Sequence, residues 1–177
     1  MEQTGTRQEE HAIAARRLGL GAPTLTVDST AFKRNQPIPR KHAGAHGRSP
    51  ELTWSAPPPG TREIVVLVED PDAPTPKPFV HWIVIGVPPD VRELVEGLPA
   101  SSVPLASGAV QGRNDMHREG YYGSEPPPGH GVHHYHFQIF AVDQPLELQA
   151  PVDRDQLLEA LRGQVLAWGE LVGTYER

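Results

Sequence analysis

The stretch from Gly120 to Asp143, GYYGSEPPPGHGVHHYHFQIFAVD, joins a loop rich in proline and glycine directly to an apolar run. Residues 135–142 alternate in the manner of a strand, so we predict a strand there. Four of the chain's nine histidines lie within the seven residues that begin at His130. Histidine changes its charge near neutral pH more readily than other side chains, and stiff loops at strand ends are common positions for binding sites. The function should therefore be sought first in this segment.

Alternation along this predicted strand separates the histidines, because successive side chains of a strand point to opposite faces of the sheet. His133 shares the apolar face with Tyr135, whereas His134 and His136 lie on the more polar face and are predicted to be surface residues. His130, between two glycines, has no place in a core and either lies at the surface or faces a ligand. Of the four histidines, only His133 is therefore placed on the apolar face, together with Tyr135, Phe137, Ile139 and Ala141.

Two further buried strands are predicted upstream. Residues 64–68 form a continuous β-branched run, typical of a strand buried on both faces, which ends at the proline-rich segment 70–74. Residues 80–87 form the other strand, and strict alternation along it places His81 on the face of Ile83. Shorter strands are expected at residues 24–29 and 52–55, with a loop at 33–48.

One substantial helix is predicted over residues 153–172, where apolar side chains recur at steps of three and four residues. The stripe consists of Leu157, Leu161, Val165, Trp168 and Val172. Asp153 fits the N-cap position, with Gln156 three residues later. Residues 1–22 are predicted to be an N-terminal extension, disordered or with a short amphipathic helix at 9–20. Residues 23–177 then form a single domain.

Composition and charge exclude several functions. A net charge of −6 without clustered basic residues argues against a surface for nucleic acid or anionic membranes. The absence of cysteine excludes disulfides, thiolate metal sites and a thiol nucleophile. No apolar run reaches the ~18–20 residues of a membrane span and no secretory signal is recognisable, so we expect a cytoplasmic protein without membrane insertion. Twenty prolines and seventeen glycines punctuate the apolar runs, as in a mainly β domain with stiff loops.

Polar side chains at the predicted strand ends could carry chemistry. Asp70 and Asp72 follow the first buried strand, and His81 begins the next. If the two strands are neighbours, Asp70 and His81 flank one connection and an Asp–His contact is expected. The Asp-Pro-Asp segment can equally be a turn held by Asx hydrogen bonds, and His81 can be a core histidine. The residues alone leave both interpretations open.

Several motifs, in order and at suitable spacing, resemble the phosphatidylethanolamine-binding protein family, and its bacterial Raf kinase inhibitor-like branch in particular. The motifs are LVEDPDAP at 67–74, VHWIV at 80–84, GYYG at 120–123 and PPPGHGVHHY at 126–135, with SPELTWS at 49–55 and GRND at 112–115. The similarity covers residues 23–177. It implies a two-sheet β-sandwich with a few peripheral helices, including a C-terminal helix, and bacterial relatives suggest a homodimer.

The resemblance also implies a small anion pocket at one end of the sandwich, occupied in the family by phosphate-like groups. Carried over residue by residue, the ligand-binding residues are Asp70, Asp72, His81, Gly123, Pro127, His133 and Tyr135. We predict no cofactor, no metal and no catalytic residue. Glu125 stands where the family has a small or neutral residue, and its carboxylate could repel an anion or point outward.

We expect ring N–H groups of His81 and His133 to donate to phosphate oxygens, with Asp70 orienting His81 through its other ring nitrogen. The main hypothesis is a soluble, regulatory protein that binds phosphate or a phosphorylated headgroup. Two alternatives stay open. One is an inhibitor or interaction protein acting on a protein kinase or a serine protease, as relatives do, and the other is an enzyme using Asp70 with His81 or His133 as an acid–base pair. Zinc-dependent hydrolysis is weaker, because the resemblance points to an anion.

Overall fold

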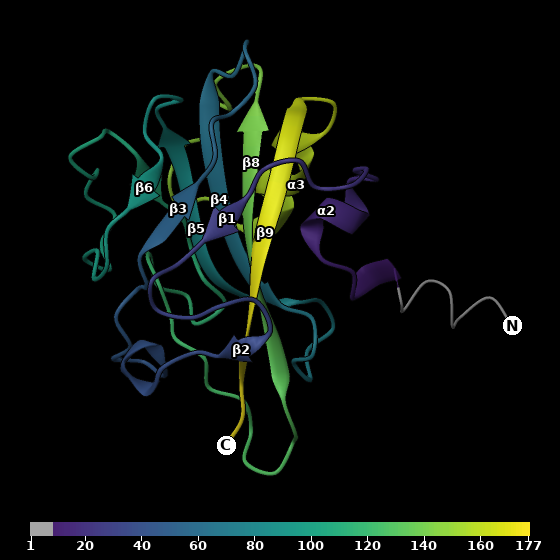
Figure 1. The fold of residues 1–177 in the computed structure, drawn as a ribbon, viewed down its shortest axis with the longest axis vertical. Helices are drawn as coiled ribbons and strands as arrows, with labels where there is room; N and C mark the ends of the chain where they lie inside the picture. The colour runs from purple at the N-terminus through teal and green to yellow at the C-terminus, as the bar shows by residue number, and fades with distance from the viewer. Residues whose placement is uncertain (1–8) are drawn as a thin grey trace, which may run out of the picture.

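The computed structural model describes residues 9–177, and they form two β-sheets (Figure 1). The strands are β1 (Val27–Asp28), β2 (Gln36–Pro37), β3 (Leu52–Trp54), β4 (Glu63–Asp70), β5 (Phe79–Val87), β6 (Glu93–Leu94), β7 (Val110–Gln111), β8 (His133–Val142) and β9 (Val165–Tyr175). They are accompanied by helices α2 (Ala14–Arg17) and α3 (Arg154–Leu161) and the 3-10 turn η1 (Arg40–His42). One sheet has the order β1-β3-β6 and the other β2-β9-β8-β4-β5-β7. The predicted mainly β, two-sheet fold is confirmed.

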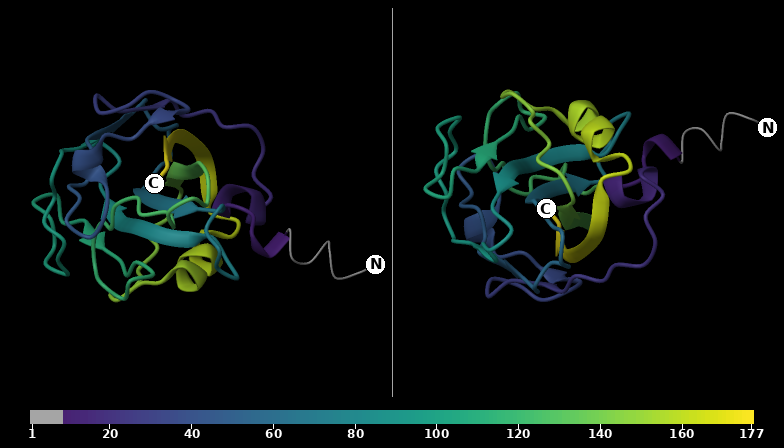
Figure 2. Two further views of the ribbon diagram at one scale, coloured as in Figure 1. Left: turned by 90° about the horizontal axis from the view of Figure 1, so that it is seen from below. Right: turned by 90° about the horizontal axis from the view of Figure 1, so that it is seen from above.

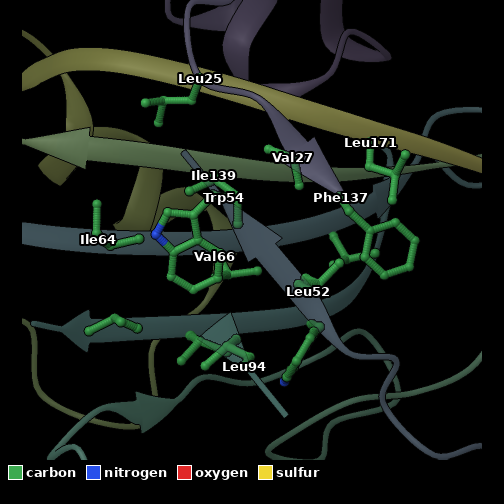
Figure 3. Close-up of a cluster of buried hydrophobic side chains, with 14 of the residues drawn as sticks. Leu25, Val27, Leu52, Trp54, Ile64, Val66, Leu94, Phe137, Ile139 and Leu171 are labelled. Carbon is green, nitrogen blue, oxygen red and sulfur yellow. The ribbon is translucent and has the colours of Figure 1, made fainter. Parts of the chain in front are cut away.

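The six-stranded sheet separates two apolar layers. The first layer lies between the sheets, where Leu25, Val27, Leu52 and Trp54 pack against Ile64, Val66, Phe137 and Ile139 (Figure 3). The second layer, on the other face, is covered by side chains of both helices, namely Ala14, Ala15, Leu157, Leu158 and Leu161. Figure 2 shows α3 on the side of the large sheet away from β1 and β3. Burial of both faces accounts for the uninterrupted β-branched sequence of β4.

The alternation predicted for β8 is confirmed. Tyr135, Phe137 and Ile139 belong to the layer between the sheets, and Phe140 belongs to the layer under the helices. β8 pairs antiparallel with β4 on one side and with β9 on the other. His133, at its first position, is therefore held on the face of the inter-sheet core.

The alternation predicted for β5 is wrong at His81, because this strand contains a β-bulge. Val68 of β4 pairs with Trp82, but the next residue, Glu69, pairs with Val80. His81 is thus the extra residue, and a bulge of this kind re-aims a side chain. The His81 ring packs against Tyr135, which belongs to the inter-sheet layer. His81 accordingly lies on the face opposite to the one predicted for it.

The helix predicted over residues 153–172 is correct only in its first half. Asp153 caps α3 with the predicted capping box, but the helix ends at Leu161 and Gly163 adopts a φ of 71°. The apolar residues beyond it belong to β9, the partner of β8 along its whole length. An ideal Cβ on Gly169 would lie 2.1 Å from the Leu25 carbonyl oxygen. β9 therefore needs glycine at this position, where the segment that contains Leu25 crosses it. The apolar steps of three and four residues therefore span two different elements, α3 and β9.

The N-terminal prediction is tested only in part. Residues 1–8 of the proposed extension lie outside the described residues, and the helix expected over 9–20 is shorter, with α2 spanning Ala14–Arg17. The strand expected over 24–29 is limited to β1, and the loop at 33–48 includes β2 and η1. Within residues 9–177, no helix combines the length and hydropathy that a bilayer crossing requires.

Candidate ligand-binding site

A cavity of about 460 Å³ opens at the end of the inter-sheet core. It is lined by the C-terminal end of β4 and the loop after it, the start of β5, the loop before β8, the start of β8 and the C-terminal arginine. The lining residues are Asp70, Ala73, Pro74, Thr75, Phe79, His81, Met116, Tyr122, Glu125, Pro126, Pro127, Pro128, His133, Tyr135 and Arg177. Distant parts of the chain therefore supply a few polar groups to a largely apolar hollow, the usual composition of a small-molecule site.

A chain of three side chains runs from the cavity wall to the surface. Nδ1 of His133 donates to Oδ2 of Asp70 at 2.7 Å, and both residues are buried. Nε2 of His133 lies 2.6 Å from Nδ1 of His130, which is exposed. Burial raises the pKa of Asp70 above its usual value, although the hydrogen bond from His133 opposes this effect. His133 therefore has both ring nitrogens engaged, and Asp70 orients His133 rather than His81.

His81 is a buried aromatic neighbour of this chain. Its Nδ1 donates to the Tyr122 carbonyl oxygen at 2.7 Å. The ring lies 4.8 Å from Phe79 and 5.1 Å from Tyr135, measured between ring centroids. Burial lowers the pKa of His81 to about 4, so the imidazole is neutral at pH 7. At neutral pH the His81 ring, which was predicted to donate to phosphate oxygens, is thus uncharged.

Three further polar side chains of the cavity wall, Tyr122, Glu125 and Arg177, lie next to one another. The Tyr122 hydroxyl donates to the Glu125 carboxylate, and Nη1 of Arg177 lies 3.8 Å from the other Glu125 oxygen. Nε of Arg177 donates to the Pro126 carbonyl oxygen at 2.7 Å, which places the C-terminal residue beside the loop before β8 (Figure 1). Burial and the hydrogen bond to Glu125 raise the pKa of Tyr122 to about 12. The Glu125 carboxylate is therefore paired with a phenol and a cation.

Comparison with known proteins agrees with this architecture. Residues 28–176 match the family model described as phosphatidylethanolamine-binding protein. The chain belongs to this family. Among its relatives, a UPF0098 protein of Pyrococcus abyssi is 40% identical over 162 residues, covering 90% of each chain. The UPF0098 protein YbcL of Escherichia coli is 36% identical over 167 residues, covering 88% of this chain and 89% of the relative.

Solved structures of family members show the same fold. The crystal structure of E. coli YbcL, described as a new member of the mammalian PEBP family, superposes with a TM-score of 0.78 at 34% identity, covering 86% of this chain and 98% of that one. A putative PEBP homologue from Chlamydia trachomatis, CT736, gives 0.76 at 36% identity, covering 88% and 99%. These matches place the chain in the bacterial and archaeal branch of the family.

Five of the seven residues that the family resemblance implied line the cavity: Asp70, His81, Pro127, His133 and Tyr135. Asp72 does not line it, since its carboxylate accepts from the backbone N–H and Nδ1 of His134, both at 2.8 Å. Gly123 does not line it either, and a Cβ at this position would lie 2.4 Å from the His42 carbonyl oxygen. Both residues shape the loops rather than the cavity surface.

Sequence reasoning missed two kinds of residue in this family member's cavity. Tyr122 and Phe79 flank His81, and their aromatic character next to a predicted strand end was the available signal. Arg177 had no such signal, because the strand that carries it to the cavity was predicted as a helix. His134 is exposed as predicted, whereas His136 is partly buried, with its Nδ1 2.9 Å from Oε2 of Glu170.

Metal ligation has little geometric basis here. Over residues 9–177, no group of three or more histidine, aspartate or glutamate side chains is positioned to hold a metal ion. The polar groups of the cavity instead pair with one another, Asp70 with His133 and Glu125 with Tyr122 and Arg177. The arrangement suits recognition of an organic ligand with a small polar head.

Proposed function

We propose that this protein binds a small ligand that carries a phosphate-like group in the cavity between the loops at 70–75 and 122–128. The supporting observation is that Arg177 lines the same cavity as His81 and His133, two of the residues that the family resemblance implied. Arginine supplies several N–H donors in a planar fork that fits phosphate oxygens. Arg177 is the one lysine or arginine among the described residues that line this cavity, so it is the natural partner of the anionic group.

The size and walls of the cavity favour a phosphate ester over a bare ion. A volume of about 460 Å³ lies within the range of ordinary small-molecule sites. Phe79, Met116 and Pro126–Pro128 provide apolar surface beside the polar groups. An organic substituent can pack there while its phosphate head faces Arg177. Proline in the loop limits the conformational entropy lost on binding.

Glu125 does not oppose this proposal. The resemblance raised the concern that its carboxylate would repel an anion. One oxygen of that carboxylate accepts from the Tyr122 hydroxyl, and the other lies 3.8 Å from Nη1 of Arg177. Both oxygens are therefore already paired with groups of the cavity wall. The kinase or protease partner and the homodimer stay predictions from the family resemblance.

A titration with inorganic phosphate and with phenyl phosphate tests the proposal, monitored by calorimetry or amide NMR shifts near the cavity. Both should bind, and phenyl phosphate should bind more tightly because of its ring. Arg177→Gln should weaken phenyl phosphate by about tenfold or more, the usual loss for a hydrogen bond to a charged group. Arg162→Gln is the matched control, since Arg162 lies at the end of α3 and is half exposed. Absence of binding, or equal affinity in Arg177→Gln, would overturn the proposal.

The Asp70–His133–His130 chain favours a second candidate, acid–base catalysis. An aspartate that orients a histidine, with that histidine linked to an exposed second ring, is an arrangement that can move a proton between cavity and solvent. Release of phosphate from phenyl phosphate, measured in the same samples, separates this candidate from binding alone. Turnover lost in His133→Asn would favour the enzyme, and stable binding without turnover would favour the binding protein.

A further inference from the structure

We propose that the cavity accepts its phosphate-bearing ligand as the protonated monoanion, because His81 presents an acceptor nitrogen that a hydroxyl of the ligand must satisfy. This inference rests on the proposed function and names the chemical form of its ligand. A phosphate monoester with one P–OH group is therefore selected over a sulfate ester of the same shape and charge.

The hydrogen bond of His81 fixes which of its nitrogens carries the proton. A carbonyl oxygen only accepts, so the nitrogen 2.7 Å from the Tyr122 carbonyl oxygen, Nδ1, must be the N–H donor. In a neutral imidazole the other nitrogen is then an acceptor. His81 lines the cavity, and Nε2 is the ring atom that remains for a ligand. Nε2 of His81 can therefore accept a hydrogen bond from a ligand group that carries a hydrogen.

The surroundings of His81 keep its ring neutral. The titratable and charged groups around it are Asp70 from β4, Tyr122 and Glu125 from the loop, His133 and Tyr135 from β8, and Arg177. The two carboxylates are already paired, Asp70 with His133 and Glu125 with Tyr122. Neither stands free to stabilise an imidazolium, and burial opposes the charge, which agrees with a pKa of about 4.

Two other polar groups of the cavity have no hydrogen left to donate to the ligand. The N–H of His133 at Nδ1 and the hydroxyl of Tyr122 are both spent on carboxylates of the cavity wall. Among the described residues that line the cavity, Arg177 alone is a fixed cation. A fully ionised phosphate could accept from Arg177 and from the Tyr135 hydroxyl, but it would leave the acceptor nitrogen of His81 without a donor. The monoanion offers ionised oxygens to Arg177 and a hydroxyl to His81. A buried acceptor without a donor is costly, and sites built for a hydroxyl reject analogues that lack it.

Phenyl phosphate and phenyl sulfate are the matched probes. Near pH 5 the phosphate ester is mainly a monoanion with one hydroxyl, since its second ionisation lies near pH 6. The sulfate ester is also a monoanion but has no hydroxyl. We expect the protein to bind phenyl phosphate at least about tenfold more tightly at this pH. His81→Asn should reduce this preference, and His134→Asn, an exposed histidine, should keep it.

The two proposals fail differently in this experiment. If both esters bind with equal affinity to the unaltered protein, the inference is wrong and the binding function stands. If neither ester binds, the proposed function fails and the inference falls with it. The comparison of the two esters uses the unaltered chain, so it decides the matter even if His81→Asn does not fold.

Discussion

His81 shows how one extra residue in a strand decides the chemistry of a cavity. The bulge in β5 turns the His81 ring toward Tyr135. Burial there lowers the pKa of His81 to about 4, so the ring stays unprotonated at pH values where an exposed imidazole would take up a proton. Folding thus holds this histidine in its neutral form over a pH range where the unfolded chain does not.

This difference predicts a pH-dependent stability. Between the unfolded pKa of 6.5 and the folded pKa of about 4, the unfolded state binds more protons, so the free energy of unfolding decreases as the pH falls. From pH 7 to pH 5 the contribution of His81 should fall by about 2 kcal/mol. His81→Asn should remove this part of the pH dependence in urea unfolding experiments.

Exposed His46 provides the control, because His46→Asn should leave the pH dependence as in the unaltered protein. Parallel losses of stability in His81→Asn and the unaltered protein would contradict the account. Comparing the two proteins at both pH values cancels the contributions of the remaining titratable groups.

At the scale of elements, β9 depends on glycine where another segment crosses it. A Cβ on Gly169 would lie 2.1 Å from the Leu25 carbonyl oxygen, a backbone atom that cannot move alone. On Gly173 it would meet the side chains of Ile38 and Phe32. The close approach of residues 25–38 to β9 therefore has no room for a side chain at these two positions.

Gly169→Ala should destabilise the protein by about 1–3 kcal/mol, the usual cost of overpacking a core. Thermal or urea unfolding measures this directly. Gly21→Ala is the matched control, since a Cβ at that position would have open space around it and the change should stay within about 0.5 kcal/mol. A stability of Gly169→Ala equal to that of the control would show that the crossing segment is free to move away.

The sequence predicts the buried strands well, because their pattern reports their local environment. The period of two in residues 135–142 placed His133 and Tyr135 correctly, since β8 has regular partners on both sides. The pattern could not predict the bulge at His81, which depends on the register with β4. Nor could it separate α3 from β9, because Leu157, Leu161 and the apolar residues after them satisfy a helical period by coincidence. Arg177 escaped prediction for the same reason.

Across the whole molecule, a buried polar cluster joins four parts of the chain on the face opposite the cavity. Oε2 of Glu69 accepts from Nε of Arg154 at 2.6 Å, and Oε1 accepts from Gln138 at 3.0 Å and from the Ala14 backbone. Arg154 also donates to the Ala12 carbonyl oxygen at 3.0 Å. The cluster therefore ties the N-terminal segment to β4, β8 and α3.

Arg154→Met should destabilise the protein by about 3–5 kcal/mol, because it leaves the fully buried carboxylate of Glu69 without its cation. Arg162→Met, at a half-exposed position paired with Glu159, should change stability by less than about 0.5 kcal/mol. Urea unfolding of both variants at neutral pH gives the comparison. A small loss in Arg154→Met would mean that water or another group reaches Glu69.

The β-bulge at His81 also affects how relatives of this chain should be compared. A histidine in the same alignment column of another protein reaches the cavity only if its strand carries the extra residue as well. Without the bulge, a histidine at this position would point into the apolar layer beneath the helices, and the adjacent residue of the strand would face the cavity. Transfer of site residues between homologues should therefore follow the pairing of β4 with β5, not sequence identity alone.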